Sequence, residues 1–70
     1  TDGYYARGLA YESLGEHQKA VEDFDKAIAH QVDAPYAYRA RASAKAALGD
    51  LEGAKADRDA AISIEHRGQQ

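Results

Sequence analysis

The chain has 70 residues, of which 44% are hydrophobic and only one is proline, so it can form one small packed domain. Its net charge is −3, whereas nucleic-acid binding requires an excess of basic residues. No apolar run is long enough to span a bilayer. The absence of cysteine excludes disulfides and thiolate zinc sites and fits a reducing compartment such as the cytoplasm. Because the chain begins at Thr1, we expect an excerpt or a processed product.

The first half of the chain contains two predicted helices, over about residues 2–14 and 17–30. Apolar and small residues recur three or four positions apart in both, so they line one face of each helix. Gly15 separates the helices, because glycine adopts the left-handed conformation that ends a helix without steric penalty. The face residues are Tyr4, Gly8, Tyr11 and Leu14 in the first helix and Ala20, Val21, Phe24, Ala27 and Ile28 in the second.

The second half contains two more predicted helices, over about residues 35–48 and 51–64. Asp33 is expected to cap the third helix and Asp50 the fourth, because a carboxylate at this position accepts hydrogen bonds from the first turn. Residues 68–70 are expected to form a frayed tail. No segment alternates with the period of two that a half-buried strand requires, so the sequence predicts an all-α fold.

The two halves repeat with a period of 34 residues. The matches keep one register without a gap, which coincidences among alanines cannot explain. They include Leu14-Gly15 with Leu48-Gly49, Arg7 with Arg41, Asp23 with Asp57, and Asp25 with Asp59. We therefore expect a single domain over 1–70, built from one helical hairpin in 1–34 and a second in 35–68, with 69–70 as a tail.

The repeated pattern resembles the tetratricopeptide repeat, which has the same length and the same spacing of aromatic and small residues. The first half carries the pattern as Tyr4, Gly8, Tyr11, Leu14-Gly15, Ala20, Phe24 and Ala27, and the second as Tyr38, Ala42, Leu48-Gly49, Ala54 and Ala61. The resemblance implies two tandem antiparallel hairpins in a short right-handed α-α solenoid. It also implies a module that binds other proteins, without catalysis and without a cofactor.

Two positions of the second half depart from this pattern. Lys45 stands where the first half has Tyr11, and Arg58 stands where it has Phe24. Two unpaired buried cations would be costly, so they must reach water or meet acids supplied from elsewhere. Either this edge ends the array and faces solvent, or it receives an acidic surface from another chain or a further segment.

Sequence patterns typical of enzymes and metal sites are missing. His17, His30 and His66 are not spaced to share a metal ion on one helix face, so we expect them to be surface residues. The two Asp-x-Asp pairs, which begin at Asp23 and Asp57, point to different sides of a helix and are expected to be solvated. We therefore predict that this chain is not an enzyme and holds no metal.

The resemblance places the first helix of each hairpin on the concave face of the solenoid. It assigns six residues to a peptide groove there: Tyr5, Leu9, Glu12, Tyr36, Arg39 and Ser43. Spacing supports part of this assignment, because Tyr5, Leu9 and Glu12 share a face that differs from the predicted core face. The donors of a carboxylate clamp for chaperone tails do not occur at the required positions, so that ligand is not expected.

Two functions follow from these observations. The preferred one is an adaptor or scaffold module that binds a peptide or helix of a partner protein in the groove. The alternative is a structural assembly or self-association element, or the terminal segment of a longer array, with no groove ligand of its own. Two hairpins bury little surface, so we also expect either a homo-oligomer or a missing neighbouring unit in the parent protein. Neither nucleic acid nor membrane is an expected partner.

Overall fold

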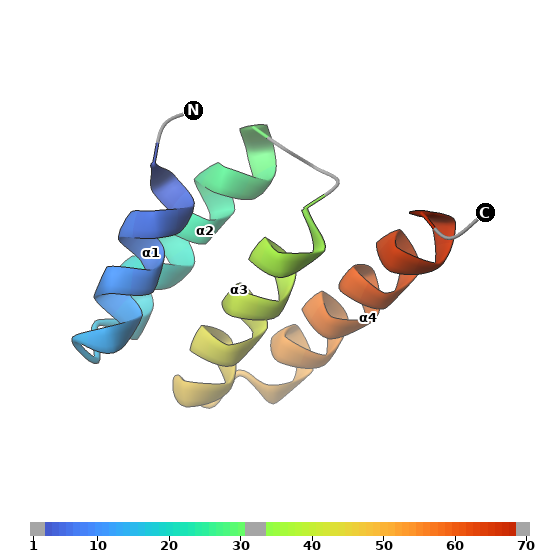
Figure 1. The fold of residues 1–70 in the computed structure, drawn as a ribbon. Helices are drawn as coiled ribbons and strands as arrows, with labels where there is room; N and C mark the ends of the chain where they lie inside the picture. Colours follow the sequence, from blue (N-terminus) through green and yellow to red (C-terminus); the bar gives the residue numbers. More distant parts are fainter. Residues whose placement is uncertain (1–2, 31–33, 69–70) are drawn as a thin grey trace.

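The computed structural model describes residues 3–30 and 34–68, and within these ranges the chain forms four helices and no strand. The helices are α1 (Tyr4–Ser13), α2 (His17–His30), α3 (Pro35–Ala47) and α4 (Leu51–Gly68) (Figure 1). This arrangement confirms the predicted all-α class, and four helices are consistent with two hairpins. No helix in the described part of the chain combines the length and the apolar character needed to cross a membrane.

The turns inside the two hairpins use glycine as predicted. Gly15 and Gly49 have positive φ angles of 80° and 89°, which a residue with a side chain adopts only with strain. At the start of α4, Oδ1 of Asp50 accepts a hydrogen bond of 3.0 Å from the backbone N–H of Gly53, so this predicted cap is confirmed.

The start of α3 and the end of α4 differ from the pattern of the other helix ends. The N-cap position of α3 is occupied by Ala34, which makes no side-chain cap hydrogen bond, while Asp33 lies outside the described residues. The helix α4 continues to Gly68, at the far limit of the predicted end near residue 64, so Gly68 belongs to the helix and not to a tail, while residues 69–70 lie outside the described residues. His66 and Arg67 in its last turn favour the extension, because cations stabilise the C-terminal end of a helix dipole.

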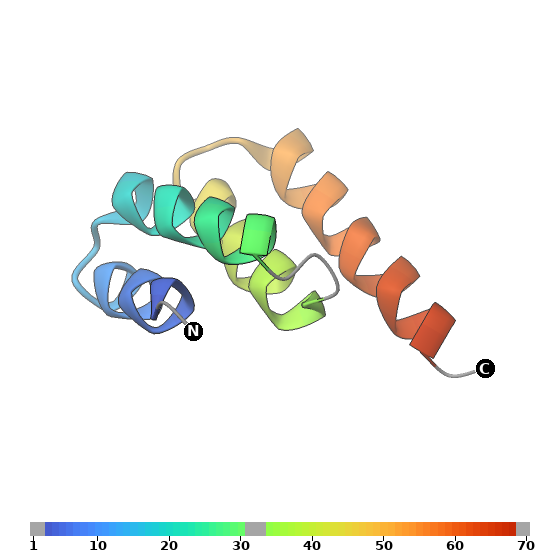
Figure 2. The same cartoon turned by 90° about the horizontal axis from the view of Figure 1, so that it is seen from above.

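The helices are arranged so that α2 packs against both α1 and α3, and α3 packs in turn against α4. Figure 2 shows α1 and α3 on one side of the molecule and α2 and α4 on the other. The first helix of each hairpin therefore contributes to a common surface.

Small residues form most of the interior. Phe24 is the one large side chain that is fully buried among the described residues. A methyl group added at Gly8 would lie 2.5 Å from a ring carbon of Phe24, so glycine is what lets α1 approach α2 so closely. The buried apolar residues are Ala20, Val21, Phe24, Ile28, Ala34, Ala37, Ala42, Ala44, Ala54 and Ala61.

Candidate functional site

An arginine on the first helix of each hairpin is paired with an aspartate on the second helix. Nε and Nη2 of Arg7 donate to Asp23 at 2.8 and 2.9 Å. The equivalent nitrogens of Arg41 donate to Asp57 at 2.9 and 2.7 Å. Asp23 and Asp57 are only 3% and 4% exposed, so the expectation that these acids are solvated is wrong. Each guanidinium group donates two hydrogen bonds to one carboxylate, and these pairs fix the position of the first helix of a hairpin relative to the second.

These pairs control the ionisation of the buried acids. The hydrogen bonds from Arg7 lower the pKa of Asp23, although burial acts in the opposite direction. Burial alone would raise the pKa of Asp57, but Arg41 and Lys45 together keep it below its ordinary value. Both acids are therefore ionised near neutral pH, and their role is structural.

Lys45 forms an ion pair with Asp57 of its own chain, which the sequence did not predict. Its Nζ is 3.2 Å from Oδ2 of Asp57, and its side chain is only 23% exposed. The two predicted environments, solvent or acids from elsewhere, are both wrong for this residue. Arg58 differs, since it is exposed and has no ion-pair partner among the described residues.

Tyr5 connects the two first helices. Its ring lies 4.8 Å from that of Tyr36 in an edge-on arrangement and 5.9 Å from that of Phe24. The sequence-based view that Tyr5 points away from the core is therefore wrong, because the ring is half-buried against both apolar clusters of the interior. It forms the floor of the surface between α1 and α3.

The other five predicted groove residues differ in exposure and in neighbours. Leu9 and Tyr36 are large side chains that stay 41% and 46% exposed. Glu12 is hydrogen-bonded at 2.8 Å to Nδ1 of His17, so this histidine is not simply a solvated surface residue. We refer to the six residues together as the first-helix surface: Tyr5, Leu9, Glu12, Tyr36, Arg39 and Ser43.

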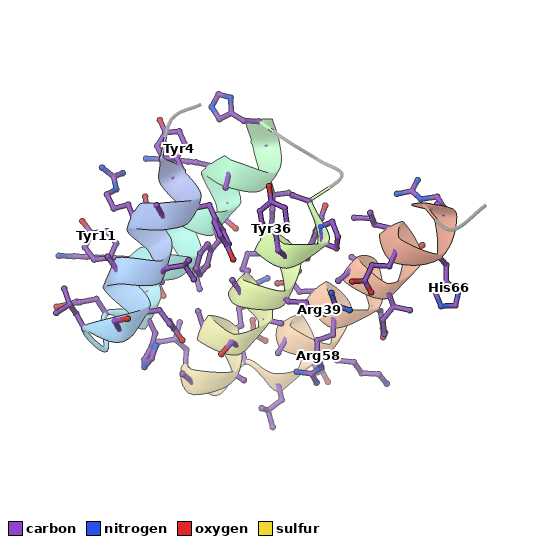
Figure 3. All side chains as sticks on the ribbon, in the orientation of Figure 1. Tyr4, Tyr11, Tyr36, Arg39, Arg58 and His66 are labelled. Atoms are coloured by element: carbon purple, nitrogen blue, oxygen red, sulfur yellow. The ribbon has the colours of Figure 1, made fainter. Side chains whose placement is uncertain are left out.

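A groove of about 380 Å³ lies between α3 and α4. We call it the end groove, and it is lined by Arg39, Ala42, Ser43, Ala46, Arg58 and Ile62. Figure 3 shows Arg39 on α3 and Arg58 on α4 on the same side of the molecule. Arg39 forms a two-point ion pair with Glu65, which raises the pKa of Arg39 and lowers that of Glu65.

The described residues include no cluster of three or more histidine, aspartate, glutamate or cysteine side chains that could hold a metal ion. The chemistry that the first-helix surface offers is contact with exposed Leu9 and Tyr36 and hydrogen bonding at its polar end around Ser43. Such a mixture of exposed aromatic, apolar and polar groups is typical of protein interaction surfaces.

Sequence reasoning missed the end groove and the pairing of Arg39 with Glu65. Glu65 lies beyond the predicted end of the last helix, so no helical face had been assigned to it. The period of 34 residues contained one signal for the end groove. Arg39 and Arg58 occupy the positions that Tyr5 and Phe24 occupy in the first hairpin.

Comparison with known proteins gives one match. Residues 1–31 match the family model of the tetratricopeptide repeat. No curated protein and no solved structure matches the chain significantly. The match covers α1 and α2, and the two further helices are consistent with a second hairpin of the same kind.

Proposed function

We propose, because residues 1–31 match the tetratricopeptide repeat, that the chain binds a peptide or a helix of a partner protein along the first-helix surface. The family is generally composed of protein–protein interaction modules. We further propose that residues 1–34 and 35–68 are the two repeat units of a single domain, with 69–70 as a tail. The chain would then act as an adaptor or scaffold, without chemistry of its own.

The observation that carries the proposal is the contact between Tyr5 and Tyr36. It joins α1 and α3 through two aromatic rings 4.8 Å apart. Tyr36 stays exposed, and so does Leu9, which lies about one helical turn after Tyr5 on α1. Exposed apolar and aromatic side chains on helices that pack together are a feature of binding surfaces, because burying them on association is favourable. The half-buried Tyr5 supports this surface from below.

The charges on this surface indicate the kind of segment that fits. Glu12 is already engaged by His17, and Arg39 by Glu65. A partner therefore gains little from a charged residue opposite either of them, since it would have to displace an existing pair. We infer a segment with an apolar side chain toward Leu9 and Tyr36 and hydrogen-bonding groups toward Ser43.

The test uses a peptide selected on the immobilised chain from a random library. Its dissociation constant is then measured by fluorescence anisotropy for the wild type, Leu9→Ala, Tyr36→Ala and the matched control Leu51→Ala. Leu51 is also an exposed leucine, 68% accessible, but it lies at the start of α4. We expect about a tenfold loss of affinity for the first two variants, the size that a central contact residue contributes, and none for the control.

Circular dichroism of each variant separates loss of contact from loss of folding. Affinity that is unchanged in Leu9→Ala and Tyr36→Ala but lost in Leu51→Ala would rule out the first-helix surface as the binding site. A selected peptide that binds all three variants as tightly as the wild type would also contradict the proposal.

A further inference from the structure

The packing of α3 against the first hairpin shows how one hairpin of this chain contacts the first helix of the next. The helix α3 rests on a receiving face of α1 and α2 that includes Tyr5, Phe24 and Ile28. Moving each of these positions by the repeat of 34 residues gives Arg39, Arg58 and Ile62. All three line the end groove between α3 and α4. The end groove is therefore the counterpart of the receiving face, and no described helix covers it.

The helix α1 carries the face that such a groove receives. On α3, the residues pressed against the first hairpin are alanines, and Ala37 and Ala44 are both 0% exposed. Their counterparts are Gly3, the N-cap of α1, and Ala10 on α1, and both are exposed. The same surface of small residues is thus buried on α3 and uncovered on α1. Small side chains let helices approach closely, so α1 is shaped for the packing that α3 makes.

Charged residues on α1 and on α4 are also complementary. Nη1 of Arg41 donates to Oδ1 of Asp25 at 2.6 Å, an ion pair that joins the second hairpin to the first. The counterparts of these residues are Arg7 on α1 and Asp59 on α4. Asp59 is exposed and has no ion pair among the described residues.

Arg7 is held in the pose that this contact requires. Asp23 binds Nε and Nη2 of Arg7, just as Asp57 binds those atoms of Arg41. The described residues supply no partner to Nη1 of Arg7, the atom that in Arg41 reaches Asp25. The side chain of Arg7 is 55% exposed, and that of Arg41 is 17% exposed. Arg41 contacts a neighbouring hairpin through Asp25, and Arg7 has no such contact among the described residues.

We propose that α1 of a second copy of this chain docks in the end groove, with Arg7 of that copy pairing with Asp59 of the first. The contact joins two different surfaces, so among the described residues of each copy one α1 face and one end groove stay available. Association is therefore open-ended and continues the order of helices seen within the chain.

Arg58 sets the strength of this contact. It replaces the fully buried Phe24 of the receiving face, so the end groove lacks an aromatic ring at its centre. The apolar stem of Arg58 can lie along the incoming helix while the guanidinium stays in water. The association is consequently weak and reversible, and Arg58→Phe should tighten it about tenfold by restoring the ring.

The experiment compares four chains by sedimentation equilibrium from micromolar to millimolar concentration. Ala10→Lys blocks the α1 face, because the counterpart Ala44 has no room for a long side chain. Asp59→Lys blocks the end groove by placing a cation opposite Arg7. Glu22→Lys is the matched control, since it makes the same charge change at an exposed position of α2. Circular dichroism establishes that all four chains are folded.

We expect the wild type and Glu22→Lys to form a concentration-dependent series of oligomers, and Ala10→Lys and Asp59→Lys to stay monomeric. Mixing the two blocked variants leaves one intact α1 face and one intact end groove, so the mixture should give a dimer and nothing larger. A mixture that stays monomeric while the wild type dimerises would indicate a symmetric contact and overturn the proposal. A fifth chain, Arg58→Phe, is measured in the same way, and monomers in all five chains would overturn the proposal as well. Peptide binding at Leu9 and Tyr36 is not involved in either result.

Discussion

Gly8 and Phe24 are in such close contact that no other amino acid fits at position 8 without displacing the ring. A Cβ atom there would lie 2.5 Å from Cε1 and 2.8 Å from Cδ1 of Phe24. Phe24 is fully buried, so its ring has little room to move aside. The same pair of positions in the second hairpin holds Ala42 and Arg58, where the ring is gone and a methyl group is accommodated.

Gly8→Ala should destabilise the fold by about 1–2 kcal/mol, although alanine is the better helix former, because overpacking outweighs the gain in helix propensity. Urea unfolding measures the effect. Repeating the substitution in a Phe24→Leu background tests the cause, since the smaller side chain leaves space for the methyl group. The penalty of Gly8→Ala should shrink there, and equal penalties in both backgrounds would show that the clash with Phe24 is not responsible.

The pair between Arg7 and Asp23 predicts a specific pH dependence. Its hydrogen bonds hold the pKa of Asp23 in the folded chain below the value of about 3.9 that an unfolded aspartate has. Stability from this pair is therefore present above about pH 4 and is lost as the pH falls further. In Arg7→Met, only the weaker attraction of Lys26 still opposes the effect of burial on Asp23. The pKa of Asp23 should therefore rise, and the stability that its ionisation contributes should be lost.

Urea unfolding of the wild type and of Arg7→Met, from about pH 3 to 7, measures this difference. The free energy of unfolding lost by Arg7→Met should be largest near neutral pH and should shrink toward acid. Parallel curves for the two proteins would mean that Asp23 does not depend on Arg7 for its ionisation.

Asp57 has two cationic partners, and they should contribute unequally. Arg41 donates two hydrogen bonds to Asp57 and a third to Asp25, while Lys45 makes a single contact of 3.2 Å. Arg41→Met should cost about 2 kcal/mol, less than a fully buried pair because Lys45 still compensates Asp57. Lys45→Met should cost less than about 1 kcal/mol. Chemical denaturation measures the loss of unfolding free energy in both variants. A larger loss in Lys45→Met than in Arg41→Met would contradict this account of the partners of Asp57.

The cap of α4 gives a further prediction. Asp50 accepts the hydrogen bond from Gly53 at the first turn, so Asp50→Ala should lower the free energy of unfolding by about 1 kcal/mol. Asp50→Asn keeps an acceptor oxygen at the same place and should retain most of the stability. If asparagine destabilises as much as alanine in thermal melts, charge rather than the hydrogen bond is what Asp50 contributes.

The helical hairpins could be predicted from sequence because their signals are local. The glycines at positions 15 and 49 end helices by their own conformational freedom, and Asp50 caps within its own helix. The end of α4 was harder to predict, because residues 65–67 contain neither a glycine nor a proline that would stop the helix.

The surfaces between helices could be predicted only in part. Periodicity assigned Tyr5 to a face away from the core, but its ring is drawn between α1 and α3 by Phe24 and Tyr36, which belong to other helices. Lys45 likewise finds its acid on α4 and not in its own helix. A helical wheel contains no information on which neighbouring helix covers a given face, so these contacts required the structure.

The measurement that tests the central claim most directly is the mapping of a library-selected peptide onto the chain by NMR. If a partner segment binds across the first-helix surface, the backbone amide signals of Leu9, Tyr36 and Ser43 should shift together and saturate at one dissociation constant. The amides of Glu22 and Ala29, which are exposed on α2, should stay unchanged. Shifts confined to α2, with Leu9 and Tyr36 unaffected, would contradict the claim that this chain recognises partners through its first helices.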